Sequence, residues 1–259
     1  MADCFLIFLL GHLAGDFLLQ THELVQRKKE GSLAAYLRHG VIHALATAAF
    51  AGLFASAYLR APKFYAVLMA LLAVHLAIDW GKIHFTANGA LRDNLSTFLG
   101  DQALHVLTIA VAAFFYAGES FSEIARTLFA LQSHRTDVLS VLGVYIAVVF
   151  AGGYAIRYLT RPMLASLPQL VEETREELRN AGMYIGWLER LLVLTAVILR
   201  SPATVGLVLT AKSIVRYPEI KSGRFAEYFL IGTLLSILLA LMGGVLLLKI
   251  LYGQVHFAP

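Results

Sequence analysis

The chain has 259 residues, of which 59% are hydrophobic and 15% charged, and its mean hydropathy is +0.71. Soluble domains are about half apolar and a quarter charged, so this balance excludes an ordinary soluble protein and indicates an integral membrane protein. The net charge of +4 is small and lies between the apolar blocks, which excludes a nucleic-acid-binding surface. The single cysteine, Cys4, excludes an internal disulfide and any site built from several thiolates.

Apolar blocks of about 17 to 25 residues recur along the chain, the length that a helix needs to cross a hydrocarbon layer about 30 Å thick. The blocks are continuously apolar and do not alternate with polar residues, which predicts helices and not a barrel. We expect full spans near residues 3–21, 33–57, 63–84, 96–117, 138–159 and 226–252.

The pattern changes between the fifth and the last span. Residues 161–183 include LVEETREELRNAG, whose mixed charges predict an amphipathic helix at the cytoplasmic surface. Apolar segments near 186–199 and 203–216 are about 14 residues each, roughly 21 Å, and predict a re-entrant or tilted hairpin. The expected fold is an all-α polytopic membrane protein with about six full spans and this short hairpin, eight apolar segments in all.

We expect two parts, a four-helix membrane domain over residues 1–117 and a remainder over 118–259. The first block lacks the basic start and small-residue cleavage site of a signal peptide, so it is expected to stay as a span. Lysine and arginine are more frequent in the loops after spans one, three and five than in the opposite loops. This asymmetry predicts an N-terminus outside and the first loop, QRKKE, in the cytoplasm.

Each of the first four predicted spans carries two ionisable residues four positions apart. The pairs are His12 and Asp16, His39 and His43, His75 and Asp79, and Asp101 and His105. An i,i+4 spacing places both side chains of a pair on one helix face. Because successive spans run in opposite directions, all four pairs fall at one depth in the same leaflet.

A charged carboxylate deep in a bilayer costs roughly 2.5 to 3.5 kcal/mol on insertion scales unless it is paired or coordinated. Aspartate with neutral imidazole is an ordinary ligand set for Zn²⁺, Mn²⁺ or Fe. We therefore predict that the eight paired residues bind one or two divalent ions, with the identity of the metal open. A proton relay, an ion pathway or a structural His-Asp network is the alternative.

Asp79 and Asp101 are also candidates for a catalytic base, and Lys82, one turn beyond Asp79, for a cation that holds an anionic substrate. A lysine whose ammonium reaches the interface from a helix end is the alternative for Lys82. Gln20 and Gln102 lie next to the pairs and are expected to orient the ligands.

A second polar set lies in the C-terminal part. Arg190, Lys212 and Arg216 approach the same predicted side and are expected to bind an anionic headgroup. Structural ion pairs of Lys212 with Glu189 or Glu227 are the alternative.

Four motifs, HLAGDFLLQ, HGVIH, HLAIDWGK and DQALH, resemble in order those of a bacterial membrane family called domain of unknown function 3307. The resemblance covers about residues 5–125, and YIGWLER and AKSIVR resemble the extension of its longer members. It implies a multi-pass protein of the bacterial inner membrane but carries no established activity. In style, though not in motif, the chain is also similar to bacterial membrane metal-dependent hydrolases.

We expect a membrane-embedded metal-dependent hydrolase that acts on a lipid-soluble, phospholipid-type anionic substrate at the cytoplasmic leaflet, with membrane lipids as its partners. A divalent-cation or proton transporter is one alternative, although the outer halves of the spans are almost wholly apolar. A membrane di-iron oxidase and a structural or partner-binding protein are further alternatives. The first lacks doubled His-His motifs, and the second does not explain so many ionisable residues at one depth.

Overall fold

A computed structural model of the chain describes residues 2–118, 134–165, 181–215 and 223–252. In these ranges the chain forms helices and no strand, which confirms the all-α prediction. The chain divides into two compact units, Met1–Ile146 and Ala147–Pro259. The boundary expected at residue 117 stays a prediction, since residues 119–133 lie outside the described ranges.

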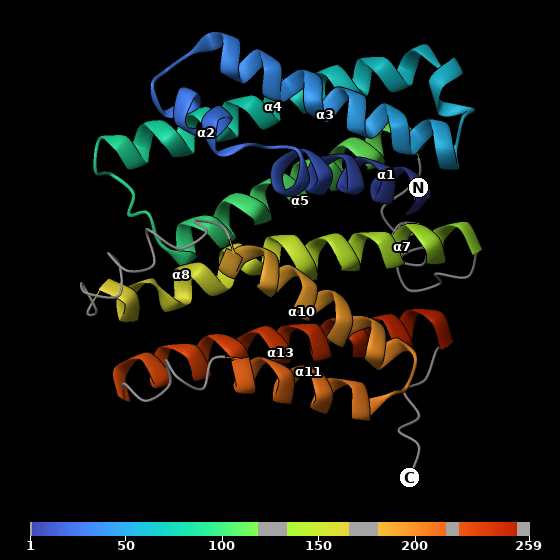
Figure 1. Cartoon of the computed structure of the whole chain (residues 1–259). Coiled ribbons are helices and arrows are strands. Elements are labelled where there is room, and N and C mark those ends of the chain that lie inside the picture. The colour runs from blue at the N-terminus through green and yellow to red at the C-terminus, as the bar shows by residue number, and fades with distance from the viewer. Residues whose placement is uncertain (1, 119–133, 166–180, 216–222, 253–259) are drawn as a thin grey trace. The chain divides into compact units, whose positions relative to one another are not determined.

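The first unit contains the spans that carry the ionisable pairs (Figure 1). Its described elements are α1 (Ala2–Leu13), the π-helix η1 (Ala14–Leu18), α2 (His22–Lys29), α3 (Leu33–Phe54), the 3₁₀ turn η2 (Tyr58–Arg60), α4 (Pro62–Ala87), α5 (Leu95–Ala117) and α7 (His134–Ile146).

Local sequence signals explain where the long helices of this unit begin and end. The Ser32 hydroxyl accepts a hydrogen bond from the backbone N–H of Ala35 at the start of α3. Asn94 caps α5 in the same way. Pro62 is the first residue of α4, a position whose N–H makes no intrahelical hydrogen bond, so proline is tolerated there. Gly118 ends α5 in the left-handed conformation that glycine adopts without a Cβ clash.

Four helices of the first unit pack as a closed ring. α1 packs against α3 and α5, and α4 packs against the same two helices, while α7 packs against the outside of α1. α2 lies against α3 and α4 (Figure 1). The ring turns the ionisable face of each helix inward.

The outward faces of the ring are apolar, as a lipid-facing surface requires. On α3, for example, Leu37, Val41 and Leu45 follow one another at i,i+4 spacing, and each is more than half exposed. The inside of the ring contains histidine and aspartate, and its outer surface contains leucine and valine. This distribution is the reverse of that in a soluble protein, where apolar residues are buried and polar residues are exposed.

Five described helices are long and apolar enough to cross a membrane: α3, α4, α5, Asp137–Leu164 and Ala226–Tyr252. The pair formed by Ala2–Leu18 and α2 passes the same test together but is bent by 90° at its break. Several membrane-suited helices are thus present as predicted, whereas the exact number of crossings stays a prediction.

The structure differs from the sequence prediction after the first span. The first helix ends at Leu18 and not at residue 21, and part of the expected basic loop forms α2. The hydroxyl of Thr21 accepts a hydrogen bond from the backbone N–H of Leu24, and Leu24 and Lys28 are both buried on one face. The N-cap by Thr21 and the burial of Leu24 and Lys28 therefore explain why this stretch, which the sequence predicts to be a basic loop, forms a helix.

The second unit contains the π-helix η3 (Ala147–Ala151), α8 (Gly152–Ala165), α10 (Ala181–Ile198), α11 (Pro202–Val215) and α13 (Gly223–Tyr252). α13 packs against α8 and α10, and α10 packs against α11. α10 and α11 form the expected hairpin, with Arg200 at φ 53° in its turn and Pro202 at the start of α11. Residues 166–180, most of the predicted amphipathic helix, lie outside the described ranges.

Candidate metal centre

All eight residues of the predicted pairs meet inside the helical ring of the first unit. Seven of them are buried, and the side chain of the eighth, Asp16, exposes 10% of its surface. The rings of His43 and His75 lie 4.1 Å apart between centroids, and those of His75 and His105 lie 4.3 Å apart. Side chains that are up to 93 positions apart in the chain therefore form one cluster.

A π-helix holds the first carboxylate. Asp16 lies in η1, where one wide turn interrupts the α-helical path of the first span. Such π-bulges are uncommon and are found mostly at functional sites, because they redirect a side chain that a regular helix would place elsewhere. Here the bulge directs the carboxylate of Asp16 toward histidines on α3 and α4.

Two glycines let α1 and α3 approach closely enough for this contact. A Cβ on Gly11 would overlap the backbone and side chain of Thr47, and a Cβ on Gly15 would overlap the imidazole of His43. The space beside Gly15 is therefore filled by a candidate ligand, His43, and the space beside Gly11 by Thr47.

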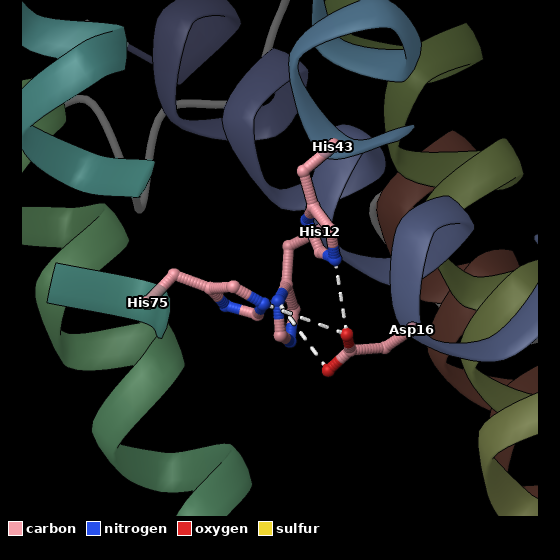
Figure 2. Close-up of side chains that lie close together, drawn as sticks. All are labelled: His12, Asp16, His43 and His75. Carbon is pink, nitrogen blue, oxygen red and sulfur yellow. Dashed lines mark hydrogen bonds and ion pairs between the residues drawn. The ribbon is translucent and has the colours of Figure 1, made fainter. Parts of the chain in front are cut away.

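The first of three candidate metal-binding groups consists of His12, Asp16, His43 and His75 (Figure 2). One potential ligand atom from each residue lies within 4.8 Å of all the others. Nε2 of His43 lies 3.0 Å and Nε2 of His75 lies 3.7 Å from Oδ1 of Asp16, while Nδ1 of His12 lies 3.8 Å from Oδ2. Three imidazoles and one carboxylate from three helices thus surround one point.

Gln102 determines which nitrogen of His12 faces that point. The amide Nε2 of Gln102 donates to Oδ2 of Asp101 at 3.1 Å, so its Oε1 faces Nε2 of His12 at 3.2 Å. Because Oε1 only accepts, Nε2 of His12 carries the proton and Nδ1 presents a lone pair. Nδ1 is buried without a hydrogen-bond partner and faces the carboxylate of Asp16, which is also an acceptor. Two buried acceptors that face each other need either a proton or a metal cation between them.

The second candidate group shares His75 with the first, and the third shares Asp79 with the second. His39, His75 and Asp79 form one, and Asp79, Asp101 and His105 form the other. Nε2 of His39 lies 3.1 Å from Nε2 of His75, and Nδ1 of His75 lies 3.0 Å from Nδ1 of His105. Gln20 contacts the ring of His39 at 3.2 Å, the type of second contact expected of it.

Two lysines pair with the remaining carboxylates. The ammonium of Lys82 donates to Oδ2 of Asp101 at 2.7 Å, so Lys82 reaches the cluster and does not extend only to the interface. Lys28 donates to Oδ2 of Asp79 at 2.6 Å and is 4% exposed. Sequence reasoning assigned Lys28 only to the basic loop. No local signal in the sequence distinguishes the buried Lys28 from the exposed Lys29 beside it.

The site is layered along the helix axes. The carboxylates, the lysines and His39 lie nearest to α2 and the turn before α5, and the other four imidazoles lie further into the ring. Beyond the imidazoles a pocket is lined by four of the histidines, two threonines and five apolar residues: His12, His43, His75, His105, Thr47, Thr108, Phe8, Leu68, Leu71, Leu72 and Ile109. One end of the site is therefore charged and the other apolar.

Aromatic side chains fill the space between the helices on the far side of the pocket. Phe8 stacks on Phe64 with centroids 5.7 Å apart, and Phe64 contacts Tyr58 at 5.9 Å and Tyr116 at 6.0 Å. Phe8 and Phe64 are almost completely buried. None of the histidines and aspartates of the three candidate groups takes part in these aromatic contacts.

The predicted headgroup-binding residues belong to the second unit, where protein groups already engage two of them. Nε and Nη2 of Arg190 donate to the carbonyl of Val149 in η3 at 3.0 and 2.7 Å, and Nη1 donates to the hydroxyl of Ser236. Lys212 pairs with Glu189 at 2.8 Å, which is one of the two ion pairs that the sequence suggested. Arg216 lies outside the described ranges, and headgroup binding by this set stays a prediction.

Comparisons with known proteins identify a family for the N-terminal half. Residues 4–131 match the family model described as "Protein of unknown function (DUF3307)", which confirms the resemblance of the four motifs. The matched range includes every residue of the three candidate groups as well as Lys28, Lys82, Gln20 and Gln102. No curated protein and no solved structure matches the chain.

Proposed function

Through residues 4–131 the chain belongs to the DUF3307 family, and because that family has no known function, we propose one from the site itself. The protein is an integral membrane metal-dependent enzyme of the bacterial inner membrane, with its N-terminus outside. It hydrolyses a lipid-soluble, phospholipid-type substrate at the cytoplasmic leaflet. Its cofactor is one or two divalent ions of Zn, Mn or Fe.

The observation that carries this proposal is the first candidate group. His12 and Asp16 present acceptor atoms to each other in a buried setting, and His43 and His75 direct further nitrogens to the same point. A divalent ion satisfies all four at once, and three histidines with one carboxylate make up an ordinary ligand set for zinc. The amide of Gln102, which orients His12, is the type of outer contact that accompanies metal-ligating histidine.

Hydrolysis fits the groups around the predicted ion. A divalent ion held by the first group would supply a nucleophilic hydroxide at neutral pH if a water joined the four protein ligands, because the ion acidifies a bound water. We assign the acceptance of a proton from this water to Oδ1 of Asp101, which is buried without a hydrogen-bond partner. The ammonium of Lys82, on a side chain that is 30% exposed, would hold negative charge on the substrate.

An amphiphilic substrate fits the layers of the site. Its polar group would lie among the histidines, and its apolar part would contact the pocket lined by residues such as Phe8, Leu68 and Ile109. The leucines and valines on the outer faces of α3 and α5 make lipid the natural surroundings of the ring.

The experiment compares the full chain with Asp16→Asn, using Asp93→Asn as control because Asp93 is exposed in the turn before α5. Each protein is purified in detergent, its metal content is measured by mass spectrometry, and it is incubated with phospholipids and polyprenyl phosphates. We expect about one or two ions and a released headgroup or phosphate for the wild type and the control, and neither for Asp16→Asn. A wild type without metal would refute the proposal. A metal-loaded wild type that converts none of these lipids would refute the hydrolase assignment alone.

A transporter is the second candidate, and one observation favours it. His39, His75 and His105 contact one another in series through ring nitrogens 3.0 and 3.1 Å apart, an arrangement suited to moving protons or ions between the three helices that carry them. The aromatic contacts of Phe64 beyond the pocket argue for a site that opens to one side. Zinc or proton flux into protein-containing vesicles, above that of empty vesicles, would favour transport over hydrolysis.

A further inference from the structure

We propose that the centre binds a single divalent ion, held by His12, Asp16, His43 and His75, and that Lys28 and Lys82 occupy with their ammonium groups the place of a second ion. This inference rests on the proposed metal site and specifies its composition. It also explains why three carboxylates lie so close together inside an apolar ring.

Only two of the three carboxylates in the cluster pair with a lysine. Asp79 is bonded to the ammonium of Lys28 at 2.6 Å, and Asp101 to that of Lys82 at 2.7 Å. Asp16 has ion-pair contacts only with histidines in the described part of the chain. A buried carboxylate needs a compensating cation, and Asp16 is the one of the three carboxylates that has no lysine partner among the described residues.

The lysines contact the oxygens that a second ion would need. Oδ2 of Asp79, which accepts from Lys28, is also the oxygen of that carboxylate that faces Nε2 of His39, at 3.3 Å. An ion bound to this oxygen and to His39 would lie within a few ångströms of an ammonium, and two cations at that distance repel strongly where water is scarce. The group of His39, His75 and Asp79 is thus closed to metal while Lys28 is in place.

The same reasoning closes the third group. Oδ2 of Asp101 accepts from both Lys82 and Gln102, which leaves only Oδ1 to face His105. Asp79, the remaining member, is already neutralised by Lys28. The first and third groups both contain a buried imidazole nitrogen without a hydrogen-bond partner, Nδ1 of His12 and Nε2 of His105. They differ in charge, because lysines pair with both carboxylates of the third group, whereas no ammonium approaches Asp16 among the described residues.

The burial of Lys28 indicates that its ammonium group compensates the negative charge of Asp79 inside the cluster. Lys28 is 4% exposed, whereas its neighbour Lys29 is exposed on the same short helix. A lysine loses hydration and side-chain freedom on burial, and its ion pair with Asp79 offsets that cost. α2 therefore brings a fixed positive charge into the cluster from the bend after the first span.

The experiment counts zinc ions in the full-length protein and in a lysine variant. Wild type, the double variant Lys28→Met, Lys82→Met, and the control Lys29→Met are stripped with chelator and dialysed against buffered Zn²⁺. Methionine keeps the length of the side chain without its charge. We expect one zinc per chain in wild type and control and two in the double variant, because Asp79 and Asp101 then require a metal cation.

The outcomes separate this inference from the proposed function. A double variant that folds and still binds one zinc overturns the inference and leaves the metal site intact, and so does a wild type that binds two. A wild type that binds no zinc overturns both. Elution as a single species in gel filtration and an unchanged helical circular dichroism spectrum establish that a variant is folded.

A second pair of variants tests the inference even if the double variant does not fold. Asp16→Asn removes a ligand of the proposed single ion and is expected to lower zinc from one per chain to none. Asp79→Asn removes a carboxylate that pairs with Lys28 and is expected to retain one zinc per chain. Loss of zinc in Asp79→Asn with retention in Asp16→Asn would place the ion at the lysine-paired carboxylates and overturn the inference.

Discussion

At the scale of single residues, the centre depends on what each polar atom faces. Nδ1 of His12 faces Asp16 because Gln102 engages the other ring nitrogen, and Asp101 in turn fixes the orientation of Gln102. One amide thus connects two carboxylates through a histidine. The i,i+4 spacing predicts that His12 and Asp16 share a face, but only the packed helices reveal which nitrogen is directed inward.

Gly15 is the residue whose replacement most directly tests this packing. Its missing Cβ leaves room for the imidazole of His43, so Gly15→Ala forces the ring aside or α1 and α3 apart. We expect a loss of stability of about 1–3 kcal/mol, as is usual for overpacking, together with weaker zinc binding. Thermal unfolding in detergent and zinc titration measure the two effects.

Gly100→Ala is the matched control, because nothing lies within 4 Å of the Cβ that it adds on α5. Alanine favours a helix over glycine by up to about 1 kcal/mol, so this variant should be as stable as the wild type or slightly more so. Equal behaviour of Gly15→Ala and Gly100→Ala would contradict the close contact of α1 with His43.

At the scale of elements, the centre requires two departures from regular helices. η1 interrupts the first span at Asp16, and α2 follows a bend of 90° that brings Lys28 to Asp79. Hydrophobic periodicity predicts neither feature. A π-bulge leaves the composition of a span unchanged, and the sequence QRKKE does not show which of its lysines is buried. The long helices were predictable because their apolar lengths and caps are local properties.

The N-cap of α2 offers a test at this scale. The hydroxyl of Thr21 accepts from the backbone N–H of Leu24, so Thr21→Val removes the cap while leaving the shape of the side chain. Loss of a cap costs about 1 kcal/mol, and backbone amides of α2 should therefore exchange with deuterium about fivefold faster. Hydrogen exchange followed by mass spectrometry of peptides over residues 22–29 measures this rate.

Thr86→Val, near the end of α4, is the control because the side chain of Thr86 makes no capping bond. It should leave exchange in α2 unchanged. Exchange that is equally slow in Thr21→Val would mean that burial of Leu24 and Lys28, and not the cap, determines the stability of α2.

At the scale of the whole molecule, the sequence predicted the convergence of the four helices well, but it did not predict which side chains pair between distant helices. The four ionisable pairs were expected at one depth because successive spans reverse direction, and the structure brings all eight residues together. The contact of Lys28 with Asp79 joins residues 51 positions apart, and no local pattern encodes such a pairing. The roles of Arg190 and Lys212 likewise depend on partners in distant helices.

The proposed orientation in the membrane is tested by single cysteines. In a Cys4→Ser background, Lys29→Cys and Arg60→Cys place exposed thiols at opposite ends of the ring. With the N-terminus outside, an impermeant maleimide should label Arg60→Cys in intact spheroplasts and Lys29→Cys only in inverted vesicles. The reverse pattern would invert the topology and move the centre to the outer leaflet.

The order of the site's residues along the chain has a consequence for biosynthesis. The histidines that contact Asp16 on other helices, His39, His43 and His75, are all translated after it. In the proposed membrane setting, the carboxylate of Asp16 would therefore enter the bilayer before these histidines and would contact them only after α3 and α4 have inserted. Association of helices that have already inserted is the second stage of membrane-protein assembly. The proposed centre would be completed in that stage, so a nascent chain that stops before α4 would lack the site even when its first helices are correctly inserted.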